Sequence, residues 1–474
     1  MTRRPASMES IKLKKLATNY TFLSGGELIS KICTFVAFVY LARVLSPQYF
    51  GYLEFTLAIM VFFNLFVDFG SSPYGAREIA KDKKQLGIIS ANIVALRVLF
   101  AIAGYLLLIA LVLFLPNKDF QIRRLILIYG ITLFGIPGFL QWIFQGFDKM
   151  KWVALGSIIR QLLFVIGVFL LIRHVEQLWF VALVECIAVV GYVLYNFYIF
   201  RSRFGQFIPQ ISLGSLKNSF LQAMPIGLSE LTWAITWYIP TILLGFIMGG
   251  KMVGWFSAAH RPVMTLHAFI WLYFFNMLPS LSRCSTESKK NLHKLMTGSL
   301  RLSAWVSVFF GISCTILADH MIRLVYGDAY SQTIFTFKIL VWVLPIALLS
   351  GHYRYALIAF NYQRDEFIAS LCAAVISLVL GVVLIPRFAV QGAAMALLTA
   401  AVVNWIVAYK FVQKKIGRIT FMNYILRPMI AGCTMIIGFL LLLPLNMWLA
   451  SAGGIMLFGF ALAILQPEVK KRFI

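Results

Sequence analysis

Charged residues are scarce in this chain, and acidic residues are the scarcest among them. Only 12% of its 474 residues are charged, whereas soluble domains average about 25%. Hydrophobic residues make up 61% of the chain, and the mean hydropathy is +0.86. So little polar surface cannot coat a water-soluble globule, which excludes soluble, disordered and fibrous proteins and nucleic-acid-binding modules. The composition predicts a polytopic membrane protein.

Signatures of metal, disulfide and hydrolase chemistry are also missing. The six cysteines show no CxxC spacing and lie in apolar runs, so we expect small core residues. No P-loop, HExxH, GxSxG or DxD motif is present. His260 and His267 share a helix face, but without a neighbouring acid or cysteine they make a weak metal site. We therefore expect no metal and no cofactor.

Long apolar runs are abundant. A helix that crosses the bilayer needs about 20 residues, because lipid cannot satisfy open backbone. The sequence predicts an all-α polytopic membrane protein with about 14 transmembrane helices, at residues 17–42, 49–72, 88–115, 121–145, 151–174, 177–200, 216–248, 251–281, 294–318, 330–357, 365–386, 391–411, 424–446 and 447–465. Pro137, Pro240 and Pro345 are predicted kink sites within these spans.

The net charge of +25 is not by itself evidence for a nucleic-acid partner. In a membrane protein the placement of the basic residues first indicates the topology. Lys and Arg gather at the N-terminus and in the loops that follow even-numbered spans, and few lie in the opposite loops. The positive-inside rule then places both termini in the cytoplasm. The opposite loops are too short to form a sizeable extracytoplasmic domain.

An internal repeat organises the spans. At one constant offset, Glu27 aligns with Glu230, and residues 50–52 (FGY) align with residues 253–255 (VGW). Later in each half Arg173 aligns with Arg387. Because each copy contains six helices, an even number, the second copy would begin on the same side of the membrane as the first. The two copies would therefore be parallel repeats. This predicts two six-helix lobes around a central cavity, with a C-terminal helix pair; the alternative is a generic run of helices in chance register.

The predicted organisation follows from these spans. Its parts are a cytoplasmic N-terminus (1–16), an N-lobe (17–200), a cytoplasmic linker (201–215), a C-lobe (216–411), a cytoplasmic loop (412–423), the last two spans (424–465) and a cytoplasmic tail (466–474).

Seven basic residues fall inside the spans, where each central charge costs about 2.5–3.5 kcal/mol and normally faces protein or water. The deeper ones are Lys31, Arg160, Arg261 and Lys338. Nearer the cytoplasmic ends, where a basic side chain can reach the headgroups, are Arg97, Arg301 and Arg354. A cationic cavity suits an anionic substrate, and the Arg fork suits phosphate. The alternative for each residue is a buried ion pair that fixes helix packing.

A second candidate face lies on span 7. Glu230, Trp233 and Trp237 are spaced by three and four residues, which places two indoles and a carboxylate on one side of the helix. Together with His260 they are candidates to contact sugar rings and hydroxyls. The alternative is an aromatic interface between lobes.

Three segments resemble a known family. Residues 41–52 read LARVLSPQYFGY, and residues 68–70 (DFG) with 77–80 (REIA) follow; residues 253–259 read VGWFSAA. These resemble the R-x-L-G-P-x-x-F/Y-G, D-x-G…R-x-I-A and V-G-x-Y/F-S-A-A patterns of bacterial polysaccharide exporters. Ser46 stands where Gly is commoner. The chain thus resembles an oligosaccharide (O-antigen) flippase of the polysaccharide transport family, in the superfamily of multidrug/toxin extruders and lipid II flippases.

The resemblance implies a function. Such a protein would move a polyprenyl-diphosphate-linked oligosaccharide from the cytoplasmic to the outer leaflet of the bacterial inner membrane by alternating access. It would not be an enzyme. Its partners would be the lipid-linked glycan and the bilayer, with a polysaccharide polymerase and chain-length machinery as further candidates and no nucleic acid. Candidates for coupling to protons or sodium are Glu27, Asp68 and Glu230.

Two alternatives stay open. A cation-coupled multidrug antiporter would share the architecture, but it should have an acidic cavity. A membrane glycosyltransferase or O-antigen polymerase should carry a large extracytoplasmic loop with catalytic acids.

The charge pattern predicts that the loops at 73–87, 201–215, 282–293 and 412–423 are cytoplasmic. A thiol reagent that cannot cross the membrane should therefore fail to label a Ser285→Cys variant in intact cells. Labelling from outside would overturn the orientation.

Overall fold

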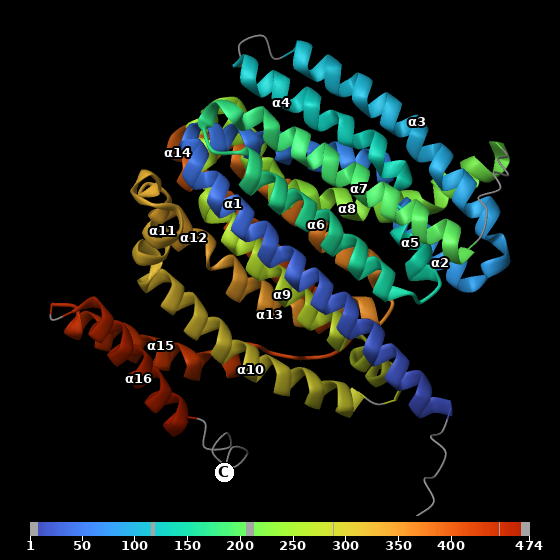
Figure 1. Ribbon diagram of the computed structural model, residues 1–474. Coiled ribbons are helices and arrows are strands. Elements are labelled where there is room, and N and C mark those ends of the chain that lie inside the picture. The colour runs from blue at the N-terminus through green and yellow to red at the C-terminus, as the bar shows by residue number, and fades with distance from the viewer. Residues whose placement is uncertain (1–7, 115–118, 205–212, 288, 445, 466–474) are drawn as a thin grey trace, which may run out of the picture. The chain divides into compact units, whose positions relative to one another are not determined.

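The chain is almost entirely helical. A computed structural model describes residues 8–114, 119–204, 213–287, 289–444 and 446–465. Helices dominate these residues and none of them forms a strand (Figure 1). This confirms the predicted all-α fold. Of the predicted cytoplasmic segments, residues 1–7, 205–212 and 466–474 lie outside the described residues.

By its contacts the chain divides into two units. The first comprises residues 1–234 and 249–254. Its helices are α1 (Met8–Asp68), α2 (Ser71–Lys81), α3 (Leu86–Leu113), α4 (Phe120–Gly130), α5 (Gln141–Gly146), α6 (Met150–Leu171), α7 (Leu178–Phe204) and the first part of α8 (Leu213–Ile247), with short 3₁₀ helices at Lys83–Gln85, Ile131–Gly138 and Val175–Gln177. Within this unit α6 packs against both α1 and α7.

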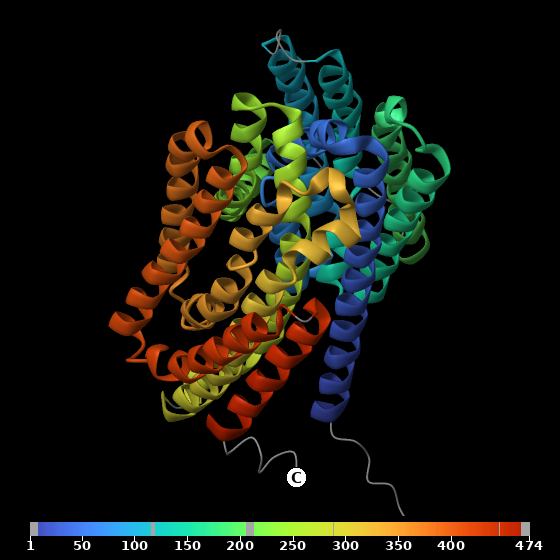
Figure 2. The same cartoon turned by 90° about the vertical axis from the view of Figure 1, so that its left-hand side faces the viewer.

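The second unit comprises residues 235–248 and 255–474. Its helices are the end of α8, α9 (Gly250–Glu287), α10 (Lys289–Ile316), α11 (Ala318–Tyr326), α12 (Thr333–Leu340), α13 (Val343–Ala359), α14 (Gln363–Lys415), α15 (Met422–Leu442) and α16 (Met447–Leu465), with a 3₁₀ turn at Asp328–Tyr330. Figures 1 and 2 show α15 and α16 lying side by side. The division into six-helix lobes stays a prediction.

The predicted spans coincide with helices, although the helices are fewer. The described residues contain 11 helical segments long and apolar enough to cross a membrane, and a shorter apolar helix at Leu449–Leu465. Two long helices each contain two predicted spans. The backbone of α1 leaves the helical region at Ser46, just before Pro47, and that of α14 does so at Ala389, shortly after Pro386.

The fourth predicted span is broken. After α4 the chain continues as the 3₁₀ helix Ile131–Gly138, which contains Pro137, and Phe139 and Leu140 are non-helical before α5. Because proline removes a backbone donor and lipid supplies none, the freed carbonyl groups need partners within the protein. Pro345 similarly lies in the first turn of α13, just after the break from α12. By contrast, α8 continues through Pro240.

Several helices present bare apolar faces. Leu99 and Leu106 on α3 are each 61% exposed, and Leu194 on α7 is 64% exposed. Large exposed apolar surfaces on a water-soluble monomer would drive association. On this chain they are the surfaces that lipid covers.

The first turn of α9 lies directly on the α1 backbone. A methyl group added at Gly51 would lie 1.8 Å from the carbonyl oxygen of Gly250 and 2.7 Å from the amide nitrogen of Gly254. One added at Gly254 would lie 1.8 Å from the carbonyl oxygen of Pro47. Only glycine permits such an approach of two backbones. Gly51 and Gly254 are also the two glycines that the repeat alignment pairs.

Replacing either glycine should therefore push these segments apart. We expect Gly51→Ala and Gly254→Ala each to destabilise the purified protein by about 1–3 kcal/mol, as overpacking does. The measurement is the melting temperature in detergent. Gly298→Ala on α10 is the control, because nothing lies within 4 Å of the added methyl group and Ala favours the helix. An unchanged melting temperature for both tested variants would contradict the close contact.

Candidate functional site

Arg97 on α3 is fully buried in the first unit. Its guanidinium pairs with Asp68 at the end of α1. It also donates to the hydroxyl groups of Ser71 (2.9 Å) and Ser72 (2.5 Å), which begin α2. On the other side it donates to the Phe139 carbonyl oxygen at 3.1 Å. We call Arg97, Asp68, Ser71 and Ser72 the Arg97 cluster.

The contacts of Arg97 use its whole donor capacity. A guanidinium has five N–H donors, and a 3.5 Å bond to the Ile136 carbonyl oxygen completes a set of five acceptors. The ring of Trp142 lies 5.9 Å from the guanidinium carbon. These contacts explain the burial of Arg97 without a substrate. One of them also gives the Phe139 carbonyl group of the broken fourth span a donor.

Two of the predicted cationic residues share one cavity of the first unit. This cavity of about 180 Å³, which we call the polar pocket, is lined by Ser30, Lys31, Thr34, Phe139, Gln141, Ser157, Arg160, Gln161 and Tyr192. The lining residues come from α1, α6, α7, the break before α5 and the first residue of α5. Lys31 and Arg160 thus line the same cavity although they lie far apart in the chain.

The two cations of the polar pocket differ in their partners. Arg160 pairs with Glu185 of α7, and its guanidinium carbon lies 5.5 Å from the ring centroid of Phe139. Lys31 is exposed and makes no ion pair with any described side chain. Within the lining, the Tyr192 hydroxyl donates to Gln141 Oε1 at 2.8 Å, and its ring meets Phe139 edge-on at 5.0 Å.

Sequence reasoning missed the uncharged members of this pocket. Ser30 and Thr34 lie four residues apart around Lys31, and Ser157, Arg160 and Gln161 follow the i, i+3, i+4 spacing of one helix face. A polar stripe beside an intramembrane charge was therefore a readable signal. Gln141 gave none, because only the break in the fourth span positions it at the start of α5.

The other basic candidates lie elsewhere. Arg354 on α13 pairs with Glu366 of α14, with Nε 3.0 Å from Oε1. Lys338 on α12 is half-buried and has no ion pair with a described residue. Arg261 on α9 and Arg301 on α10 are half-buried.

The aromatic face predicted on span 7 is divided between the units. In the second unit Trp237 is buried, and its ring lies 4.7 Å from His267 and 5.9 Å from His260 of α9. Phe256 stacks on His260 at 5.3 Å. In the first unit Trp233 is 40% exposed. The structure therefore brings Trp237 and His260 together and gives Trp233 a different environment.

The structure does not gather the three ion-coupling candidates into one site. Asp68 belongs to the Arg97 cluster, where it accepts hydrogen bonds from Ser71 (3.1 Å) and Ser72 (2.9 Å). Glu230 is half-buried on the first part of α8. The side chain of Glu27 lies outside the described residues.

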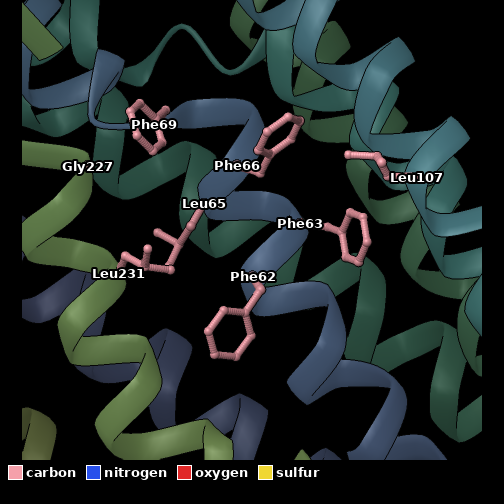
Figure 3. Close-up of a pocket in the computed structure, with 8 residues that line it drawn as sticks. All are labelled: Phe62, Phe63, Leu65, Phe66, Phe69, Leu107, Gly227 and Leu231. Atoms are coloured by element: carbon pink, nitrogen blue, oxygen red, sulfur yellow. The ribbon is translucent and has the colours of Figure 1, made fainter. Parts of the chain in front are cut away.

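The first unit contains a second, apolar cavity of about 270 Å³ (Figure 3). It is lined by Phe62, Phe63, Leu65, Phe66, Phe69, Leu107, Gly227 and Leu231, from α1, α3 and α8. A sugar or phosphate here would lose its hydrogen bonds to water and gain none. This cavity is thus unsuited to a glycan head group.

Comparison with known proteins agrees with the motif resemblance. Residues 16–285 match a family model described as "Polysaccharide biosynthesis protein". A protein of Escherichia coli (strain K12) named for O-antigen transport is 23% identical over 393 residues, which cover 81% of this chain and 93% of that protein.

Solved structures share the fold. The lipid II flippase MurJ, in an inward closed conformation, matches with a TM-score of 0.77 at 15% identity, over 94% of this chain and 99% of that one. An inward-facing multidrug resistance MATE family transporter of the MOP superfamily matches with a TM-score of 0.70 at 13% identity, over 82% and 94%. At these identities the likeness concerns the fold alone.

The Arg97 cluster predicts a stability defect. Asp68→Asn keeps the side-chain shape but leaves a buried guanidinium uncompensated, which should destabilise the protein by about 3–5 kcal/mol. Membrane abundance and melting temperature should both fall. Glu78→Gln, which removes exposed ion pairs with Arg77 and Lys81, is the control and should cost about 1 kcal/mol or less. Lost transport at normal stability for Asp68→Asn would instead favour ion coupling.

Proposed function

We propose that this chain, which belongs to the polysaccharide biosynthesis protein family, is a transporter. It would flip a polyprenyl-diphosphate-linked oligosaccharide across the membrane. The glycan would move from the cytoplasmic to the outer leaflet of the bacterial inner membrane by alternating access, with both termini of the chain in the cytoplasm. Family membership, the flippase-like fold and the relative named for O-antigen transport support this proposal.

The observation that carries it is the polar pocket. Lys31 and Arg160 lie in a polar cavity formed by membrane-spanning helices, with Glu185 as the carboxylate paired there. An intramembrane charge is expensive and usually functional. An ammonium group without a described counter-ion favours an anionic substrate over a neutral or cationic one.

Further candidates for the substrate path are Arg261 and Lys338, together with the ring face of Trp237 and His260. Arg301 also stays a candidate. Arg97 and Arg354 are weaker ones, because each already has a carboxylate partner.

Multidrug extrusion is the second candidate, because the fold also matches a MATE transporter. A site for an organic cation needs an acid that is not already neutralised. In the polar pocket the nearby acid, Glu185, is paired with Arg160, and Lys31 adds positive charge. The pocket therefore supports the flippase over the drug antiporter.

Neutralising Lys31 should strongly reduce export without affecting folding. In cells that depend on this chain, Lys31→Gln should reduce surface polysaccharide by roughly ten- to a hundred-fold, the effect of losing a charge-assisted hydrogen bond of about 1.5–3 kcal/mol. Lys31→Arg keeps the charge and should retain most export.

The measurement is surface polysaccharide alongside membrane abundance. Lys217→Gln, an exposed lysine on α8, is the matched control and should export normally. Full export by Lys31→Gln at normal abundance would remove Lys31 from the substrate path. Cation-dependent resistance to lipophilic dyes that survives Asp68→Asn but needs Glu230 would instead favour the antiporter.

A further inference from the structure

A chain of short hydrogen bonds links a buried histidine of the second unit to an exposed tyrosine. His352 on α13 has no exposed surface, and its Nε2 atom lies 2.6 Å from Ser299 Oγ on α10. Ser299 Oγ lies 2.5 Å from the hydroxyl oxygen of Tyr273 on α9, and Tyr273 is 38% exposed. We call Tyr273, Ser299 and His352 the histidine relay.

The partners of His352 fix the direction of each hydrogen bond in the relay. Nδ1 lies 3.1 Å from the Leu348 carbonyl oxygen, which only accepts, so Nδ1 carries a hydrogen. In a neutral imidazole Nε2 is then an acceptor, and the Ser299 hydroxyl donates to it. Because Ser299 has a single hydrogen to donate, its oxygen accepts from the Tyr273 hydroxyl. A neutral His352 therefore gives the relay one defined arrangement.

The relay can also take up a proton without losing a hydrogen bond. A hydronium ion donates a proton to the hydroxyl oxygen of Tyr273, whose own hydrogen passes to Ser299, and the hydrogen of Ser299 passes to Nε2 of His352. Nε2 then donates to Ser299, Ser299 donates to Tyr273, and Tyr273 donates outward. One proton has entered, each bond has reversed its direction, and the ring is an imidazolium. The thioether of Met277, 3.6 Å from Ser299 Oγ, is only a weak competing acceptor.

The described surroundings of His352 provide no counter-charge for an imidazolium. Among the described side chains, none that carries a charge forms a hydrogen bond or ion pair with this ring. From α9 the ring is faced by Tyr273, with ring centroids 6.4 Å apart, and by Phe274, edge-on at 4.9 Å. Protonation therefore places an uncompensated positive charge in the core of the second unit.

The helices around the relay supply few acids, and those of α14 are already paired. α10, α12 and α13 contain no acidic residue, and α9 has one, at its last position. The two acids of α14 are Glu366, which pairs with Arg354 of α13, and Asp365, which pairs with Lys415. α10 and α12 instead contribute the half-buried cations Arg301 and Lys338.

The packing around the ring makes its protonation a conformational signal. A methyl group added at Gly351 would lie 2.1 Å from the Phe274 ring, so α9 lies directly on α13 beside His352. A buried charge without a partner is strongly disfavoured. The protonated ring therefore favours a conformation in which α9 and α13 separate and water reaches His352. A ligand that binds one of two conformations more tightly shifts their populations toward it, and here the ligand is a proton.

The predicted topology places the relay near the cytoplasmic surface. Ser299 lies about one and a half turns after the predicted start of the ninth span at 294, and His352 lies about as far before the predicted end of the tenth span at 357. The charge pattern assigns both of these span ends to the cytoplasm. The exposed Tyr273 thus gives a proton a short path between the cytoplasm and His352.

We propose that His352 is a proton-binding site of this transporter, and that Ser299 and Tyr273 conduct the proton between it and the cytoplasm. The bound proton would drive the change between the conformations of the transport cycle. The use of the proton in transport rests on the proposed function, whereas proton binding itself does not.

Proton binding is measured by exchange of the imidazole C2 hydrogen for deuterium, followed by mass spectrometry of the purified full chain. The exchange rate at His352 should follow a titration curve between about pH 5 and 8, the range in which histidine changes its charge. His293, an exposed histidine of α10, gives the reference curve in the same sample. No exchange at His352 beside normal titration of His293 would overturn the proposal and make His352 a core residue.

Transport is measured in proteoliposomes that contain a fluorescent lipid-linked glycan and a trapped pH indicator, with the membrane potential clamped. A pH gradient should accelerate glycan exchange by the wild type several-fold, and His352→Gln should abolish this acceleration. Tyr273→Phe and Ser299→Ala should each slow the glycan-dependent proton movement at least about tenfold, because the path is interrupted. His293→Gln and Tyr198→Phe, which alter exposed residues, are the controls and should behave as the wild type does.

The outcomes separate this inference from the proposed function. If His352→Gln lowers the melting temperature, Tyr273→Phe decides, because it removes only the hydroxyl group of an exposed residue. Glycan exchange that the gradient leaves unchanged in the wild type, or proton movement that Tyr273→Phe leaves unchanged, would overturn the proton site and leave the flippase. Titration of His352 without glycan movement by the wild type would overturn the flippase and leave the proton site.

Discussion

The buried guanidinium of Arg97 is the interaction on which the rest of the first unit depends. Lipid cannot satisfy open backbone, so the broken fourth span is tolerated only where the protein supplies donors. Arg97 supplies one to the Phe139 carbonyl group while Asp68 balances its charge. The break in turn places the Phe139 ring and Gln141 in the polar pocket. A structural arginine thus positions a site that it does not line.

Much of the fold could be predicted from the sequence, because apolar length alone indicates a spanning helix. The kinks at Pro137 and Pro345 were also predictable, since proline removes a backbone donor. The breaks within α1 at Ser46 and within α14 at Ala389 also agree with the sequence, because each of these long helices contains two predicted spans.

The candidate site was only partly predictable. An intramembrane charge indicates importance, but a sequence does not show whether its partner lies in the protein or in the substrate. The sequence separated Arg160 from Arg97 and Arg354 by depth, yet each of the three has a carboxylate partner in the structure. Lys31 differs from these arginines because it has no ion pair with a described side chain, and only the fold reveals this difference. Gln161 could have been found from the polar stripe that it forms with Ser157 and Arg160, whereas Gln141 could not, because only the break in the fourth span positions it.

The central claim is that this chain translocates a lipid-linked glycan. The most direct measurement reconstitutes the purified protein in liposomes with a fluorescent polyprenyl-diphosphate oligosaccharide and follows its access to a membrane-impermeant quencher. The account predicts that the wild type exchanges the fluorophore between leaflets and that Lys31→Gln, at equal reconstitution, does not. Equal exchange in liposomes with and without the protein would contradict it.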